Sequence, residues 1–225
     1  ALQGELDDIA ASETVRVVVI AGAGKAFCAG HDLKEMRANH DKGFMQALFK
    51  QCGDLMLTLT RMPQPVIARV HGIATAAGCQ LVSMCDLAVT ADVAKFAVSG
   101  INVGLFCSTP AVGLARNLGR KAALEMLLTG DFIDAMEAKS KGLVNRVVPA
   151  DALDSEIERL TQSILAKSAV AVRMGKGMFY RQLEMGLDDA YAYAGEVMAC
   201  NMMSEDAGEG IDAFMQKRKP NYRGV

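Results

Sequence analysis

The sequence has few aromatic residues (5%), only five prolines and no long apolar run. No apolar stretch reaches the ~18 residues that a membrane-spanning helix needs, and the N-terminus lacks the basic-then-apolar pattern of a secretion signal. The 24 basic and 26 acidic residues nearly cancel and are interspersed, so no basic stripe suggests nucleic acid or a lipid surface as partner. We therefore expect a soluble intracellular protein that binds neither nucleic acid nor membrane.

Pairs of closely spaced metal-ligating residues are also absent. The six cysteines form no CxxC pair, and no histidine lies near them at the spacing of a zinc site. We expect no metal site and reduced thiols. The cysteines are Cys28, Cys52, Cys79, Cys85, Cys107 and Cys200.

What the chain does have is a pattern of strands that feed helices. With 225 residues, 51% of them hydrophobic, it can form one substantial core. Helical spacing in residues 1–13 precedes a buried strand, "VRVVVIAGAG", and a second strand, "PVIARV", leads into a helix over 76–84 and a third strand, "DLAVTA". Strands that alternate with helices indicate stacked parallel strands with crossover helices.

The pattern changes to helices from about Thr109, interrupted only by the strand-like residues 142–149. We expect an α/β core over residues 1–148 and a C-terminal helical region over residues 149–225. Fourteen methionines suit adaptable packing in a helical core or a subunit interface.

Two turns share an unusual composition of small residues where a strand feeds a helix. They are "GAGKAFCAGHDLKEM", residues 22–36, in which Asp32 is a candidate N-cap, and "RVHGIATAAGCQLVSMCDLAV", residues 69–89. Small residues let a ligand approach the backbone, and free N–H groups at a helix start stabilise negative charge. Two such donors that converge on one carbonyl oxygen would form an oxyanion hole. His71 and Asp86, within the second stretch, are assigned structural roles in a turn and at a strand end.

Four segments in order, "AFCAGHDLKEM", "GIATAAGCQLVSMCDLAV", "KAALEMLLTGDFIDAMEAKSKGLVNRVVP" and "GEGIDAFMQKRKP", resemble signatures of the enoyl-CoA hydratase/isomerase (crotonase) superfamily. The segment 101–110 is most similar to the enoyl-CoA hydratase domain-containing protein 3 subfamily. The resemblance implies a spiral core of ββα units and a helical C-terminal region that builds homotrimers or hexamers. It also implies an acyl-CoA substrate, no tightly bound cofactor beyond the coenzyme A of that substrate, and a cytoplasmic or, in a eukaryote, mitochondrial matrix location. The family's N-terminal strand hairpin is missing here, which we attribute to disorder or trimming.

By position, the resemblance makes Ala29 and Ala77 the two oxyanion N–H donors. It places Lys25, Asp32, Leu33 and Lys34, beside Ala29, where the family contacts coenzyme A; an ordinary surface role is the alternative for Lys34.

The family's two catalytic glutamates are replaced. Gln80 stands three residues after Ala77, where the first glutamate is expected, and Gly100 stands at the second position. Neither residue can take a proton from water near neutral pH, which argues against efficient hydration. His31 follows the first turn, in a "GHD" that also resembles methylmalonyl-CoA decarboxylases, and is either catalytic or a residue that shapes the turn. Cys107 lies near the acid of family isomerases and is either a pocket residue or a buried thiol.

Three functions remain open: a weak hydratase or isomerase, an acyl-CoA enzyme that needs no carboxylate (a decarboxylase or thioester-cleaving enzyme), and a non-catalytic acyl-CoA-binding regulator.

Overall fold

The computed structural model describes residues 1–225, which form two compact units. The helical unit comprises Ala1–Val18, Thr60–Pro65 and Arg159–Val225, and the sheet unit comprises Val19–Leu59 and Val66–Glu158. The predicted functional division, acyl-CoA binding in residues 1–148 and oligomerisation in 149–225, stays a prediction.

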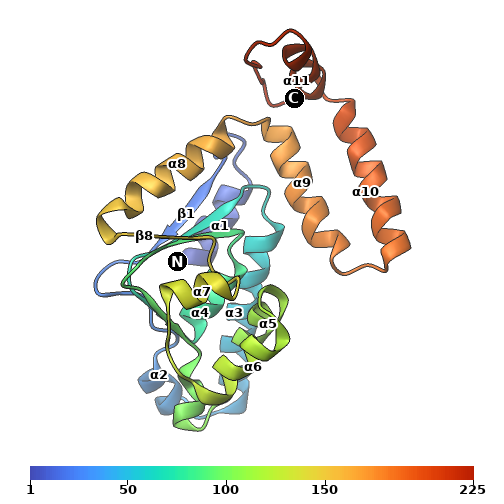
Figure 1. The fold of residues 1–225 in the computed structure, drawn as a ribbon. Coiled ribbons are helices and arrows are strands. Elements are labelled where there is room, and N and C mark those ends of the chain that lie inside the picture. The colour runs from blue at the N-terminus through green and yellow to red at the C-terminus, as the bar shows by residue number, and fades with distance from the viewer. The chain divides into compact units, whose positions relative to one another are not determined.

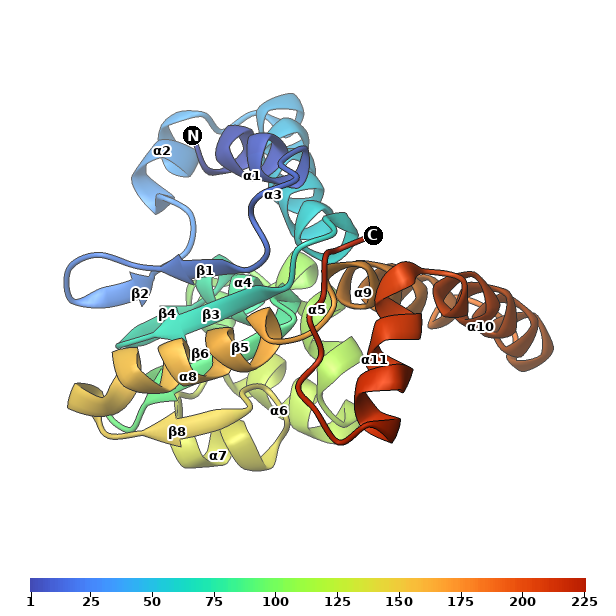
Figure 2. The ribbon, with the colours of Figure 1, turned by 90° about the horizontal axis from the view of Figure 1, so that it is seen from above.

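The sheet unit contains two four-stranded sheets, with strand orders β1-β3-β5-β8 and β2-β4-β6-β7. Pairing is parallel between β3 and β5, between β5 and β8, and along β2, β4 and β6, whereas β7 runs antiparallel to β6. Figure 2 shows β3, β5 and β8 side by side. The strands are β1 (Val18–Ala21), β2 (Ala26–Cys28), β3 (Val66–Val70), β4 (Ile73–Thr75), β5 (Leu87–Ala91), β6 (Lys95–Ala97), β7 (Ile133–Asp134) and β8 (Arg146–Val148).

Each turn of the core repeats the order strand, strand, helix, so the ββα spiral implied by the family resemblance is confirmed. β3, β4 and α4 form one repeat, and β5, β6 and α5 form the next after a short 3₁₀ helix. The helices are α2 (Leu33–Ala38), α3 (Lys42–Arg61), α4 (Ala77–Met84), η1 (Ser99–Val103), α5 (Ser108–Asn117), α6 (Arg120–Thr129), α7 (Ala135–Ser140), η2 (Ala150–Ala152) and α8 (Leu153–Leu165), of which α3 and α8 run into the helical unit.

The central strand β3 shows why the sequence folds this way. Val66, Ile67, Ala68 and Val70 are fully buried, as expected for a parallel strand covered on both faces. Asp86, at the start of β5, accepts a hydrogen bond of 2.6 Å from the Val66 amide and so fixes the beginning of β3. The structural role expected for Asp86 is confirmed.

The residue pattern alone did not reveal the second sheet. Strands β2, β4 and β6 have three residues each, and β7 has two, so no alternation could reveal them. The prediction that only residues 142–149 interrupt the later helices is therefore wrong, because β7 lies at Ile133–Asp134 and pairs with β6.

The helical unit contains α1 (Leu2–Ala10), α9 (Ala169–Gln182), α10 (Leu187–Met202) and α11 (Glu205–Met215). Helices α9 and α10 lie side by side (Figure 1). Buried Asp206 joins α11 to the chain end, because it accepts hydrogen bonds from Ser168 Oγ and from the amides of Arg223 and Gly224. No helix of the chain is both long and apolar enough to cross a membrane.

Candidate functional site

The two small-residue turns lie against each other in the sheet unit. Gly30 has φ of +94°, and a Cβ built on it would lie 2.9 Å from the Ala76 Cβ and 3.3 Å from the Ala77 nitrogen. A Cβ on Gly78 would lie only 2.1 Å from the Cys28 carbonyl oxygen. Glycine is therefore required at both positions, and the absence of side chains brings the start of α4 into direct contact with the turn that follows β2.

The second turn holds its shape through an unusual backbone. Ala76 caps α4 with φ of 51° and ψ of −120°, a region that residues other than glycine rarely adopt, and its amide donates to the Ala97 carbonyl at 3.0 Å. Ala77 is the first residue of α4, so its N–H has no carbonyl one helical turn earlier. The Ala77 and Ala29 amides donate no hydrogen bond to the chain.

A cavity of about 360 Å³ opens beside these two amides. That volume is in the range of small-molecule sites, and most of its lining is apolar. No Asp, Glu, Lys or Arg lines it. The lining residues are Ala29, His31, Leu33, Met36, Phe49, Ala76, Ala77, Ser99, Gly100, Val103, Leu105, Phe106, Cys107, Ser108, Thr109 and Pro110.

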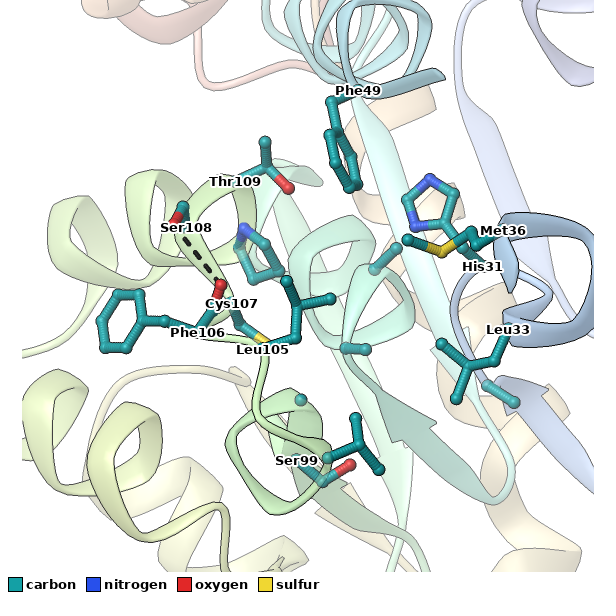
Figure 3. Close-up of a pocket in the computed structure, with 16 residues that line it drawn as sticks. His31, Leu33, Met36, Phe49, Ser99, Leu105, Phe106, Cys107, Ser108 and Thr109 are labelled. Carbon is teal, nitrogen blue, oxygen red and sulfur yellow. Dashed lines mark hydrogen bonds between the residues drawn. The ribbon is translucent and has the colours of Figure 1, made fainter. Parts of the chain in front are cut away.

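Figure 3 shows that two banks face each other across this cavity. His31, Leu33 and Met36 come from the turn before α2 and from α2 itself, whereas Leu105 and Cys107 come from the segment before α5.

His31 is a histidine on the cavity wall with few polar neighbours. Its ring packs edge-on against Phe49, with ring centroids 5.7 Å apart. Burial lowers the pKa of His31 below its ordinary value of 6.5, and the nearby Glu35 carboxylate opposes this only partly. The imidazole is therefore mainly neutral at pH 7, with one nitrogen able to accept a proton.

Gln80 does not line the cavity, although Ala77 on the same helix does. It is buried (4% exposed), and its Oε1 accepts a long hydrogen bond of 3.8 Å from Cys52 Sγ on α3. The Gln80 side chain therefore contacts α3 and not the cavity.

Gly100 lines the cavity, but the space for a side chain there is already filled. A Cβ on Gly100 would lie 2.5 Å from the Leu105 carbonyl oxygen and 2.7 Å from Cys107 Sγ. Cys107 is buried, and its thiol donates to the Val98 carbonyl at 3.4 Å. The segment before α5 therefore occupies the room into which a residue at position 100 would project.

Of the residues expected at coenzyme A, Ala29 and Leu33 line the cavity. Asp32 caps α2 as predicted, because its Oδ1 accepts from the amides of Lys34 (2.8 Å) and Glu35 (3.4 Å). Leu33 lines the cavity and is 55% exposed. Lys25 and Lys34 are exposed and do not line it.

His71 is placed in a turn, as expected. Its Nε2 lies 2.9 Å from the Gly24 carbonyl oxygen, and the ring does not line the cavity.

Four of the lining residues were not expected from the sequence. Phe49 and Thr109 line the cavity from α3 and α5, and Leu105 and Phe106 line it from the segment before α5. Phe49 sits on the same helix face as other apolar residues, so its spacing indicated only packing. The only signal available in the sequence was the adjacent pair of large apolar residues Leu105 and Phe106 in one short segment, which the structure leaves exposed.

The sequence of the chain is similar to that of known proteins over nearly its whole length. The sequence model of the enoyl-CoA hydratase/isomerase family matches residues 2–225. The chain is 45% identical over 219 residues to the rat mitochondrial enoyl-CoA hydratase domain-containing protein 3. The aligned region covers 97% of this chain and 73% of the relative. The Xenopus laevis counterpart is 47% identical, with 97% and 74% covered.

Solved structures of the same family are also similar to this chain. An enoyl-CoA hydratase of Mycobacterium smegmatis is 61% identical with a TM-score of 0.97, covering 98% of this chain and 86% of that one. Human enoyl-CoA hydratase domain-containing protein 3 is 45% identical with a TM-score of 0.94, covering 98% and 88%. The chain therefore belongs to the enoyl-CoA hydratase/isomerase family. Within that family, its similarity to the domain-containing protein 3 subfamily, first indicated by residues 101–110, is confirmed.

Proposed function

We propose that the chain binds an acyl-CoA with the thioester carbonyl oxygen between the N–H groups of Ala29 and Ala77, and that it is a poor hydratase. The observation that supports this most is the contact between the two turns. Gly30 and Gly78 bring together two amides that donate to nothing in the chain, beside a largely apolar cavity. Two donors preorganised in such a site are suited to an enolate or tetrahedral oxyanion.

The cavity wall supports the second half of the proposal. Hydration needs a group that takes a proton from water and returns one to the neighbouring carbon. No carboxylate lines the cavity, and Gln80 and Gly100 stand at the positions that the family resemblance assigns to the two glutamates. In this proposal Lys25, Asp32, Leu33 and Lys34 lie along the coenzyme A.

A ligand comparison tests the oxyanion pair without altering the protein. Butyryl-CoA and its thioether analogue, which lacks only the carbonyl oxygen, are titrated by calorimetry. We expect the thioester to bind at least about fivefold more tightly, because each of the two hydrogen bonds contributes roughly 0.5–1.5 kcal/mol. Equal affinities would remove the role of Ala29 and Ala77.

Replacement of Ala77 by Pro is the matched protein test. Proline is tolerated at the first position of a helix and removes only the N–H there, so the preference for the thioester should shrink. Because Ala76 has an unusual backbone, the variant is used only if its thermal melting matches that of the wild type. A folded variant that keeps the full preference contradicts the proposal.

Decarboxylation is supported less well than thioester binding. No Lys or Arg lines the cavity to hold a substrate carboxylate.

We also propose a homotrimer or hexamer, supported by exposed apolar side chains on α9, α10 and α11, among them Leu187 (74%), Met198 (70%) and Phe214 (84%). Light scattering behind a sizing column tests this. A mitochondrial matrix location in a eukaryotic source is supported by the vertebrate relatives named as mitochondrial.

A further inference from the structure

The imidazole of His31, on the cavity wall, has no role in the proposed binding of the thioester. Among the lining residues, only His31 and Cys107 carry groups that titrate in the ordinary range, and Cys107 is a buried thiol hydrogen-bonded to the Val98 carbonyl. His31 stands two residues after Ala29, so its ring enters the cavity from the same turn that provides a proposed oxyanion donor.

The surroundings of His31 favour the neutral form of its imidazole, which can act as a base. The rings of His31 and Phe49 on α3 meet at 88° with centroids 5.7 Å apart, Ala76 and Ala77 line the same cavity, and Glu35 on α2 is the one charged group with a resolved influence on the imidazole. No hydrogen bond to a group of the chain engages either ring nitrogen of His31, so both nitrogens are free to meet a ligand or a water molecule.

We infer that His31 is the general base of a thioester hydrolase that acts on the acyl-CoA bound between Ala29 and Ala77. This inference rests on the proposed function and extends it from binding to a reaction. Water is the co-reactant, and the reaction needs no oxidant, reductant or cofactor.

The reaction balances in two steps. A water oxygen bonds to the thioester carbonyl carbon while one water proton passes to the free nitrogen of His31, and the carbonyl electron pair moves to the oxygen held by the two amides. The oxyanion then collapses, the carbon–sulfur bond breaks, and the coenzyme A sulfur takes the proton from His31. The products are a carboxylic acid and coenzyme A, and the imidazole returns to its neutral form.

An uncharged cavity suits this chemistry. Water needs a base close to neutrality, which a neutral imidazole supplies, and a carboxylate product leaves readily from a site that contains no cation to hold it.

The test compares residues 1–225 of the wild type with the His31→Gln variant of the same length. Release of coenzyme A from butyryl-CoA and from decanoyl-CoA is followed by chromatography, which avoids interference from the protein's own thiols. We expect the variant to lose at least about 100-fold in kcat, the usual size of a general-base contribution, with KM changed little. His40→Gln, at an exposed histidine between α2 and α3, is the matched control and should keep the wild-type rate.

The pH profile separates a base from a packing residue. The wild-type rate should fall as pH drops through the lowered pKa of His31, below 6.5, because the protonated ring cannot accept a proton. His31→Gln should show no such inflection. Phe49→Leu removes the ring-edge contact but keeps the imidazole, and should retain an inflection, moved in pH. A purely structural His31 would make the two variants behave alike and would overturn the inference.

The other outcomes are distinguishable. Binding of the thioester with a preference over its thioether, but without coenzyme A release from either substrate by wild type, overturns the hydrolase and leaves the binding proposal standing. Failure to bind either thioester overturns both proposals. An equal rate and profile in His31→Gln assigns the proton transfer to another group and also overturns the inference.

Discussion

Two regions of the cavity wall differ in how their backbone is built. At the first, which we call the carbonyl end because the thioester carbonyl is proposed to bind there, two turns touch because glycines at positions 30 and 78 leave no side chain between them, and two amides remain free. At the second, which we call the closed end, the missing side chain of Gly100 leaves no free space, because the Leu105 carbonyl and Cys107 Sγ fill it. Glycine thus leaves backbone amides accessible in one place, and in the other it lets a neighbouring segment pack directly on the backbone.

This contrast shows that the same residue type has no fixed meaning for function. A glycine next to free N–H groups keeps a binding site accessible, whereas a glycine beneath a neighbouring segment permits close packing. Only the neighbours in space separate the two cases, and the following substitutions test that separation.

The largest effect is expected at the carbonyl end. Gly78→Ala puts a methyl group 2.1 Å from the Cys28 carbonyl oxygen, so the two turns must separate. We expect a loss of about 3 kcal/mol in the free energy of unfolding, at the upper end for overpacking, together with loss of thioester binding. Urea denaturation and calorimetry measure the two effects.

Gly53→Ala, within α3, is the control for a glycine in a helix. An added Cβ there meets nothing within 4 Å, so we expect a gain of about 0.5–1 kcal/mol from helix propensity. Similar stabilities for the two variants would show that the turns can move apart without cost.

The next effect concerns the closed end. The double variant Gln80→Glu with Gly100→Glu restores both residue types of a hydratase, but the side chain at position 100 meets the Leu105 carbonyl and the Cys107 thiol. We expect no hydration of crotonyl-CoA above wild type and a loss of about 2 kcal/mol in stability from Gly100→Glu alone. The assay is the loss of the enoyl thioester absorbance.

Gln80→Glu alone tests the buried position through pH. Burial beside Cys52 would raise the pKa of the new carboxyl group above its unfolded value, so the charged form is disfavoured in the folded protein. The variant should be close to wild type in acid and lose stability as pH rises above about 4.3, the ordinary pKa of Glu. Thermal melts at several pH values measure this, and a pH-independent difference would contradict it.

For the double variant, rapid hydration of crotonyl-CoA would contradict the expectation and show that the closed end can open.

The smallest effect is expected at Ala76, which adopts a glycine-like backbone without being glycine. Ala76→Gly should relieve strain of about 1–3 kcal/mol, offset partly by the larger entropy of the unfolded chain, for a net gain of up to about 1 kcal/mol. Thioester affinity should stay unchanged, because the amide of Ala77 is retained. A net loss of stability would mean that the methyl group of Ala76, which faces Gly30, contributes packing.

The sequence predicted the long elements well and the short ones poorly. Helices α3 and α4 and strands β3 and β5 were indicated by their periodicity and by the prolines and glycines at their ends. Strands β2, β4 and β6, with three residues each, are set by pairing with one another, and such pairing leaves no local pattern. The family resemblance, and not the residue pattern, indicated them.

The candidate site shows the same division. Two compositionally unusual turns indicated where free N–H groups would lie, but the family resemblance was needed to select Ala29 and Ala77 within them. His31 was a candidate because it follows the first turn. Phe49 and Thr109 could not be proposed, because helices far apart in the sequence bring them to one cavity. The sequence also could not reveal that Gly100 is covered, since the atoms that cover it belong to residues five and seven positions further on.

The covered Gly100 makes the order of substitutions matter. A larger residue at position 100 carries a cost while the carbonyl of Leu105 and the thiol of Cys107 stay in place, but the same residue would be tolerated after a change that withdraws that segment. The effect of one substitution therefore depends on the background in which it occurs, which is epistasis with a structural cause. For directed evolution toward a hydratase, libraries should vary residues 104–107 first and introduce the carboxylates second.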